Sequence, residues 1–197
     1  RDYFIENGYV IFKQSIKKED IELVLKHFKN FVGKNGLYYS QSNHNWRKTS
    51  KDTDEFGLLK NSMENFTSLL LEPKLAKAGR KILLSAIMAD CLSKVSGSQD
   101  DFCMWQNMFF DKSVGTVDHI DTWYLDTKPR GQMIAAWISL EDIHKDAGRF
   151  FVYPESHKLN IKENVNNTIK DHYKYAEFIN EYIQKNNLKK YAPALKR

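Results

Sequence analysis

The sequence predicts an α+β fold in which helices come first and strands follow. Up to about residue 86, apolar residues recur at the three- and four-residue spacing of amphipathic helices. From residue 101 onward, short apolar and aromatic runs alternate with turn residues at close intervals, which is typical of strands. Helices followed by closely spaced strands indicate helices that flank a β-sandwich or a β-barrel.

The N-terminal segment predicts a strand and then a helix. Residues 8–12, Gly-Tyr-Val-Ile-Phe, form a short apolar run after a turn-forming Asn-Gly pair. Ser15 is placed to cap a helix over about 17–32, and Gly33 and Gly36 follow its end. The apolar face expected for this helix consists of Ile21, Val24, Leu25, Phe28 and either Phe31 or Val32.

The next segment predicts a loop and two more helices. Residues 38–54 are polar and aperiodic, so we expect a long loop, either a mobile lid or an ordinary surface connection. Helices are predicted over about 57–71 and 73–86, the second with Pro73 in its first turn. Residues 87–98 fit either a helix end or a strand.

The C-terminal half predicts strands, one broad aromatic helix and the start of a last strand. Its apolar runs are bounded by Gly, Pro and Asp, which favour turns. The predicted strands span 102–110, 114–119, 133–140 and 150–153, the helix spans 168–186, and 189–195 begin the further strand.

The composition is that of one globular domain over residues 1–197. No apolar run is long enough to cross a membrane, and Arg1–Phe4 does not resemble the start of a signal peptide, so we expect a cytoplasmic protein. Cys91 and Cys103 lack a metal-binding spacing and are expected to be reduced, buried thiols, with a disulfide as the alternative.

The net charge of the chain indicates which kinds of partner it can attract. The chain carries a net charge of +5, mostly from lysine, which fits either a solvated surface or attraction of an anionic substrate. The sequence has no nucleic-acid-binding motif and no dense arginine cluster, so we expect no nucleic-acid partner. The oligomeric state is not indicated.

A His-x-Asp pair, His119 and Asp121, is the most informative local pattern. Side chains two residues apart on an extended backbone point to the same side, so an imidazole and a carboxylate are brought together. With a second histidine, such a pair forms the facial triad that holds Fe(II) and leaves sites open for oxygen and an organic cosubstrate. The alternative is a His and an Asp in a surface turn.

Four segments form an ordered set along the sequence. They are Tyr3–Ile11, with its Gly-Tyr pair; His119–Asp121, followed by Tyr124; Ala136–Asp142, with Trp137; and Gly148–Lys158, which ends in Pro-Glu-Ser-His-Lys. They cover nearly the whole chain, and the ordered set is more specific than any one motif. In this order they resemble the phytanoyl-CoA dioxygenase family of Fe(II)- and 2-oxoglutarate-dependent oxygenases.

The resemblance implies a double-stranded β-helix (a cupin-like jelly roll) with flanking N-terminal helices. It implies a dioxygenase that uses Fe(II), 2-oxoglutarate and O2 to hydroxylate a small organic substrate. His119 and Asp121 match the family's first two iron ligands, and Asn107, Tyr124 and Trp137 match positions around the 2-oxoglutarate pocket. Strand-edge hydrogen bonding remains the alternative for Asn107, and plain core packing for Trp137.

The family's remaining site residues are not matched. The distal His ligand and the Arg that binds 2-oxoglutarate follow a Gly-Asp turn, which we expect beyond Arg197, together with the last strands of the barrel. His157 lies in a family turn that does not bind iron, and the other histidines are expected to be ordinary side chains. A non-catalytic binding module or inactive fragment on the same scaffold is the main alternative function, and hydroxylation of a protein or peptide is a further one.

Overall fold

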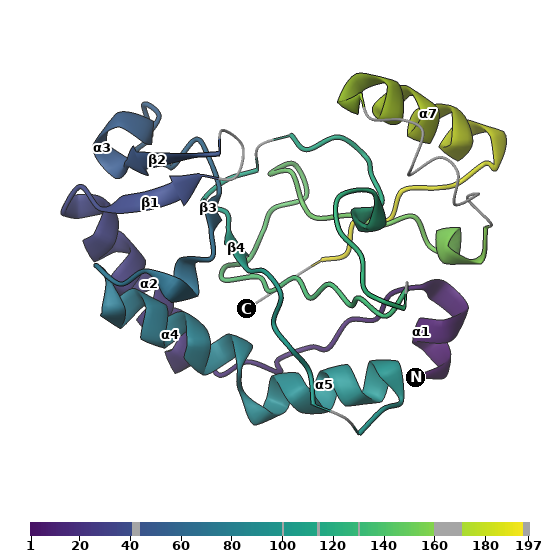
Figure 1. The fold of residues 1–197 in the computed structure, drawn as a ribbon, viewed down its shortest axis with the longest axis horizontal. Coiled ribbons are helices and arrows are strands. Elements are labelled where there is room, and N and C mark those ends of the chain that lie inside the picture. The colour runs from purple at the N-terminus through teal and green to yellow at the C-terminus, as the bar shows by residue number, and fades with distance from the viewer. Residues whose placement is uncertain (41–43, 100, 114, 130, 160–170, 195–197) are drawn as a thin grey trace. The chain divides into compact units, whose positions relative to one another are not determined.

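The computed structural model of the chain describes residues 1–40, 44–99, 101–113, 115–129, 131–159 and 171–194 (Figure 1). It shows an α+β protein, as predicted, whose residues cluster into two compact units. Unit 1 contains Arg1–Ile11, Gly115–Ile138 and His144–Ala194. Unit 2 contains Phe12–Val114 and Ser139–Ile143.

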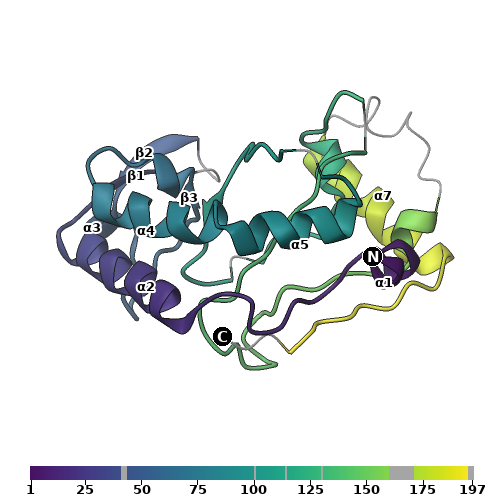
Figure 2. The same cartoon turned by 90° about the horizontal axis from the view of Figure 1, so that it is seen from below.

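Two helices pack side by side in unit 2. Helix α2 (Lys18–Gly33) lies beside α4 (Pro73–Leu83), and both views of this unit show the pair (Figures 1 and 2). Lys81 of α4 pairs with Asp20 of α2 at 2.6 Å. The predictions of helices over 17–32 and 73–86 are therefore confirmed, although Lys17 rather than Ser15 precedes the first one. The buried side chains of α2 are Ile21, Val24, Phe28 and Phe31, which lie on the predicted apolar face.

Residues 87–98, which fitted either a helix end or a strand, belong mostly to helix α5 (Ala86–Ser96). The Ser85 hydroxyl accepts a hydrogen bond from the backbone N–H of Met88 at 3.2 Å, which caps the helix start. Gly97 ends the helix in a left-handed conformation, with a φ of 75°. The two caps explain why this segment forms a separate helix.

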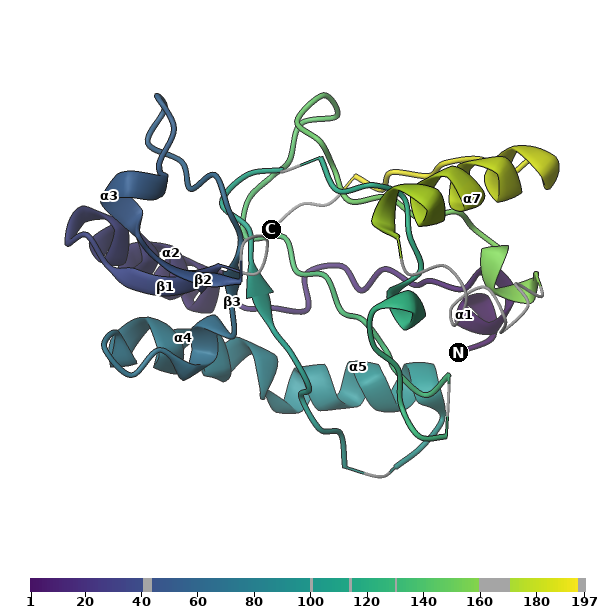
Figure 3. The same ribbon diagram turned by 45° about the horizontal axis from the view of Figure 1, so that its top comes forward.

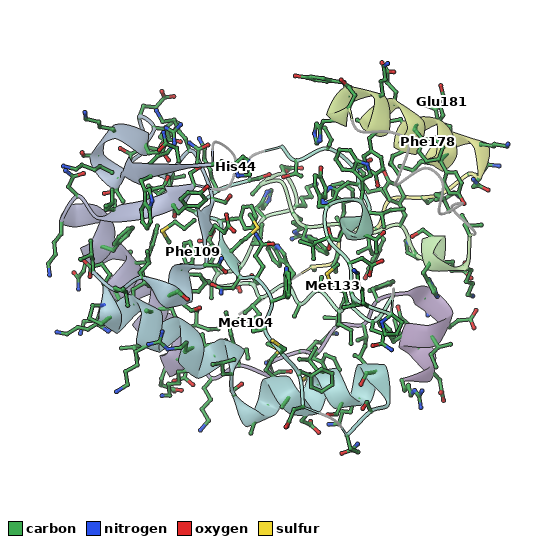
Figure 4. All side chains as sticks on the ribbon, viewed as in Figure 1. His44, Met104, Phe109, Met133, Phe178 and Glu181 are labelled. Carbon is green, nitrogen blue, oxygen red and sulfur yellow. The ribbon has the colours of Figure 1, made fainter. Side chains whose placement is uncertain are left out.

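A small antiparallel sheet completes unit 2, in the strand order β2-β1-β3-β4 (Figure 3). Its strands are β1 (Leu37–Ser40), β2 (Asn45–Lys48), β3 (Met63–Glu64) and β4 (Met108–Phe109). Ser40 pairs with Met63, and Met63 pairs with Phe109. Phe109, labelled in Figure 4, stacks on Phe28 of α2 at a ring distance of 4.4 Å, so the sheet and the helices share one core.

The prediction of a loop over 38–54 is wrong in its described part. This segment forms the β1–β2 hairpin and the one-turn helix α3 (Thr49–Asp52), while residues 41–43 lie outside the described residues. Tyr38 is fully buried, and its hydroxyl donates to Asp52, which also pairs with Arg47 at 3.1 Å. Each strand has only four residues, too few to show a periodic pattern, and two of the polar side chains of the segment, Tyr38 and Asp52, pair with each other inside the protein. The expectation that this segment covers the active site as a lid stays a prediction.

The helix predicted over 57–71 is also wrong. Gly57 and Asn65 have φ values of 79° and 49°, which an α-helix cannot accommodate. The segment instead contains a bridge between Thr53 and Leu59, strand β3, and the short 3-10 helix η1 (Phe66–Ser68).

Unit 1 contains helices joined by long irregular segments. Its elements are α1 (Asp2–Asn7), the 3-10 helices η2 (Asp121–Trp123) and η3 (Ser156–Lys158), and α7 (His172–Lys185). Helix α7 confirms the described part of the helix predicted over 168–186; residues 168–170 lie outside the described residues. The strand predicted over 8–12 is wrong, because that segment has no regular structure.

The C-terminal strands are mostly not seen. Within the predicted ranges 102–110 and 150–153, only Met108–Phe109 is a strand, and Val152 forms a single bridge with Tyr191 of the predicted 189–195 strand. The described residues of 115–119 and 133–140 contain no strand; Val114 and Leu195 lie outside the described residues. The pattern of apolar residues shows that a segment can be buried, but a strand also needs a hydrogen-bonding partner. The jelly roll is therefore not shown by this structure.

Burial was also overestimated in this half of the chain. Phe102 and Trp105 are 37% and 78% exposed, and Cys103 is exposed while Cys91 is half-buried. Across the part of the chain that the structure describes, none of the helices has the length and apolar character needed to span a membrane.

Candidate functional site

The backbone brings His119 and Asp121 together in unit 1. Ile120 between them is extended, with φ −111° and ψ 127°, so the two flanking side chains point to the same side. Asp121 then begins η2, and its carbonyl oxygen accepts hydrogen bonds from the N–H groups of Tyr124 and Leu125 at 2.9 and 3.1 Å. The carboxylate therefore sits on a hydrogen-bonded turn.

The imidazole and the carboxylate are in direct contact. His119 Nε2 lies 3.1 Å from Asp121 Oδ1, and the Asp121 side chain is half exposed. The other imidazole nitrogen, Nδ1, lies 2.7 Å from the backbone oxygen of Val117. Hydrogen bonding to Asp121 raises the pKa of His119 above its usual value, and the Val117 carbonyl adds to this, while burial opposes it.

This donor pair fits part of a metal site. The Val117 oxygen and the Asp121 carboxylate both only accept, so without a metal these contacts suit an imidazolium that donates from both nitrogens. Once Nε2 loses its proton, Nδ1–H can stay bonded to Val117 while Nε2 offers its lone pair to a metal. Two ligands at right angles, each about 2.1 Å from an ion, lie about 3.0 Å apart, close to the separation seen here. One nitrogen and one oxygen donor also suit Fe(II). Among the described residues no group of three or more His, Cys, Asp or Glu is arranged to hold a metal ion.

A second His-x-Asp pair shows what distinguishes this one. His144 and Asp146 have the same spacing, but both side chains are more than two-thirds exposed. The Nδ1 atom of His144 faces both the backbone N–H of Asp146, at 3.3 Å, and its carboxylate, at 3.4 Å, whereas in the first pair it is Nε2 that faces the carboxylate. The second pair is therefore a surface turn, and it offers a matched control.

Tyr124 lies beside His119, where the sequence places it. Its ring meets the imidazole edge to face at 5.3 Å, and its hydroxyl hydrogen-bonds with Nδ1 of His172 at 3.3 Å. Burial raises the pKa of Tyr124, and the charge of Asp121 adds to this, so the phenol stays neutral. Half of its side chain is exposed, so its ring lies beside the donor pair but does not shield the pair from solvent.

Trp137 and Asn107 lie in different surroundings. Trp137, in unit 1, stacks on Phe150 at 5.4 Å and is 40% exposed, so it is not a buried core residue. Asn107, in unit 2, donates from its amide to Thr67 Oγ1 at 3.0 Å, and its amide oxygen accepts from the Thr67 N–H at 3.3 Å. These bonds give the Asn107 amide a structural role; its role toward 2-oxoglutarate stays a prediction, as does that of Trp137.

His157 has a structural contact of its own. Its Nε2 lies 2.8 Å from the backbone oxygen of Ile5, and Lys158 pairs with Glu6 at 2.6 Å. Gly8, with a φ of 77°, ends α1 so close to this ring that an added Cβ would lie 2.4 Å from Nδ1. The Ser-His-Lys turn therefore fastens α1, and in this structure His157 has no contact with the donor pair.

Two parts of the site carry no signal in the sequence. Tyr175 of α7 approaches Ile120 from 55 residues away, and its helical spacing indicates only burial. Asp118, next to His119, accepts a hydrogen bond from Tyr153 at 2.5 Å and lies 3.7 Å from Lys190. Burial and this carboxylate raise the pKa of Tyr153 to about 12, so the phenol remains a donor.

Comparison with known proteins establishes the family to which the chain belongs. The model of the phytanoyl-CoA dioxygenase family matches residues 4–194, so the chain belongs to that family and the resemblance seen in the sequence is confirmed. Family membership associates the chain with oxygenase-type chemistry and with a cupin-like fold. No curated protein and no solved structure matches the chain.

Proposed function

We propose that the protein is an Fe(II)- and 2-oxoglutarate-dependent dioxygenase that hydroxylates a small organic substrate. Family membership over residues 4–194 supports the reaction class. The single observation that carries the assignment to residues is the convergence of His119 Nε2 and Asp121 Oδ1 at 3.1 Å, with Nδ1 occupied by Val117.

His119 and Asp121 would hold the iron, and a third protein ligand is required for the facial triad. When bound, the iron supplies O2 activation, with 2-oxoglutarate as the co-reductant. The Val117 carbonyl lies against Nδ1 and so orients the His119 ring with Nε2 toward Asp121. Tyr124 packs against the imidazole and limits its rotation.

The proton on His119 is part of this function. A metal ligand must be deprotonated, and contact with Asp121 favours the imidazolium in the absence of metal. Metal binding must therefore release that proton, and Asp121 must exchange its hydrogen bond for coordination. Because Asp121 is half exposed, a proton can leave directly to water.

We assign an anionic substrate to this enzyme. The net charge of +5 raises the local concentration of anions near the protein and accelerates their encounter. Small organic acids and their conjugates, 2-oxoglutarate among them, carry this charge at neutral pH.

Replacement of Asp121 tests the proposal. In the full-length native protein, Asp121→Ala should abolish Fe(II) binding and 2-oxoglutarate decarboxylation, measured by metal analysis and by succinate formation. The matched variant Asp146→Ala, in the exposed pair with the same spacing, should retain both. Retention of iron by Asp121→Ala would overturn the assignment of the ligands.

A non-catalytic binding module on the same scaffold is the second candidate. The observation that favours it is that the described residues supply two converging donors rather than three. If the protein binds 2-oxoglutarate but forms no succinate in the presence of Fe(II) and O2, the binding module is the correct alternative.

A further inference from the structure

Tyr175 holds the backbone between the two metal-site residues. It lies in α7 and is 1% exposed, and its hydroxyl accepts a hydrogen bond from the backbone N–H of Ile120 at 3.1 Å. The same hydroxyl lies 3.5 Å from the backbone oxygen of Ile120, a long contact that still orients it toward this peptide. A buried phenol thus meets the residue whose extended conformation places His119 and Asp121 on one side.

The ring of Tyr175 makes a second contact with the same segment. It stacks on Trp123 with a centroid distance of 4.1 Å and an interplanar angle of 7°. Trp123 is the last residue of η2, the turn that Asp121 begins, and its N–H donates to the Ile120 oxygen at 3.0 Å. Tyr175 therefore fixes the chain on both sides of Asp121, by hydrogen bonding before it and by stacking after it.

We propose that Tyr175 is a positioning residue that sets the separation of His119 Nε2 and Asp121 Oδ1 and thereby the affinity of the site for its metal. This inference rests on the proposed function. His119 and Ile120 lie on an irregular segment, where no strand ladder holds Ile120 in its extended conformation, and Asp121 begins the short turn η2. Without Tyr175, ordering this segment would have to accompany metal binding and would weaken it.

Replacement of Tyr175 by Phe separates the two contacts. The ring remains and can stack on Trp123, whereas the hydroxyl that accepts from Ile120 is lost. The exposed Tyr173, on the same helix and 80% exposed, offers the matched control Tyr173→Phe. Removal of a partner that orients a metal ligand commonly weakens affinity by about 10- to 100-fold.

The experiment is a Co(II) titration of the native full-length protein, followed by the visible absorption of bound Co(II). Tyr175→Phe should raise the Co(II) dissociation constant by about 10- to 100-fold and alter the absorption band, while its far-ultraviolet circular dichroism stays that of the wild type. Tyr173→Phe should leave the dissociation constant and the band unchanged. Equal Co(II) affinity of Tyr175→Phe and wild type would overturn the inference.

A second measurement keeps the inference testable if the Tyr175→Phe variant does not fold. In the metal-free wild type, the Ile120 N–H should exchange with solvent more slowly than the amide of an unstructured peptide of the same sequence, because the Tyr175 hydroxyl accepts from it in a part-buried contact. Rapid exchange of that amide would overturn the role of Tyr175 whatever the metal result. A wild type that binds no Co(II) would overturn the proposed function itself, whereas a wild type that binds it as tightly as Tyr175→Phe overturns only the positioning role.

Discussion

The Nδ1 atom of His119 lies 2.7 Å from the backbone oxygen of Val117, and this contact determines what the imidazole can do. The carbonyl only accepts, and so does the Asp121 carboxylate that lies 3.1 Å from Nε2, so the contacts favour a ring protonated on both nitrogens when no metal is bound. In the pair formed by His144 and Asp146, it is Nδ1 that faces the carboxylate, at 3.4 Å. Two motifs with the same residue spacing therefore differ in the nitrogen that faces the carboxylate.

The protonation of His119 is a direct prediction from these contacts. In metal-free protein, a pH titration followed by nitrogen chemical shifts should show that Asp121→Asn lowers the pKa of His119, because the carboxylate that stabilises the imidazolium is lost. Asp146→Asn, in the exposed pair, is the control and should leave the pKa of His119 unchanged. An equal pKa of His119 in the wild type and in Asp121→Asn would contradict the contact between Nε2 and the carboxylate.

Removal of the His157 side chain should weaken the fold and leave the proposed metal site intact. The variant His157→Ala loses the hydrogen bond to the Ile5 oxygen that fastens α1, at a cost of about 1 kcal/mol in the free energy of unfolding. Chemical denaturation measures that cost, and metal analysis measures iron content. Loss of iron by this variant, with no such loss by His144→Ala, would show that His157 is a ligand.

Asn107 distinguishes a structural role from a cosubstrate role. Its amide bonds to the side chain and backbone N–H of Thr67, which is 1% exposed, so Asn107→Ala leaves buried polar groups without partners. We expect a loss of about 1–3 kcal/mol in the free energy of unfolding. Gln106→Ala, which removes one 3.3 Å contact with Glu64, should cost less and serves as the control.

The two roles of Asn107 also predict different binding. If the amide is structural, 2-oxoglutarate affinity should remain near that of the wild type at a temperature where the Asn107→Ala variant is folded. Isothermal calorimetry measures that affinity. A folded variant that has lost 2-oxoglutarate binding would show that the amide contacts the cosubstrate.

The helices that could be predicted from the sequence are those whose signals are local. The apolar face of α2 contains Ile21, Val24, Phe28 and Phe31 at helical spacing, and all four are buried. Pro73 likewise opens α4, at its predicted place. Such patterns depend only on the segment itself, so they could be recognised without knowledge of the rest of the fold.

Elements that depend on distant partners could not be predicted in the same way. The β1–β2 hairpin was hidden because Tyr38 and Asp52 satisfy each other inside the protein, so the segment appears polar and aperiodic. The expected strand over 133–140 fails for the converse reason, since an apolar run does not specify its pairing partner.

The candidate site shows the same division. His119 and Asp121 could be chosen from their spacing, since period-two alternation follows from an extended backbone. Tyr175 holds that backbone from 55 residues away. It could not be chosen from the sequence, because a tyrosine at this helical position is equally suited to ordinary burial. The two donors could be identified from the sequence, and the structure shows the hydrogen bonds that orient them.

Asp111 makes the stability of unit 2 depend on pH. Burial raises the pKa of this carboxyl, and the charges of Asp54 and Glu141 add to that, while the Leu59 N–H, which donates to it at 2.8 Å, opposes it. The unfolded chain therefore loses this proton at a lower pH than the folded protein does. The contribution of Asp111 to stability is complete below the unfolded pKa and is lost as the pH rises through the folded pKa.

The variant Asp111→Asn isolates this effect, because its amide oxygen can still accept from Leu59 but does not ionise. Measured by urea denaturation across a pH series, its stability relative to the wild type should increase as the pH rises from below to above the usual Asp range of about 4. Asp54→Asn should behave in the opposite sense, since Lys112, 2.6 Å from Asp54, lowers the pKa of that carboxyl and its contribution is lost as the pH falls. If the curves of wild type and Asp111→Asn stay parallel while Asp54→Asn diverges from the wild type, Asp111 has no raised pKa in the folded protein.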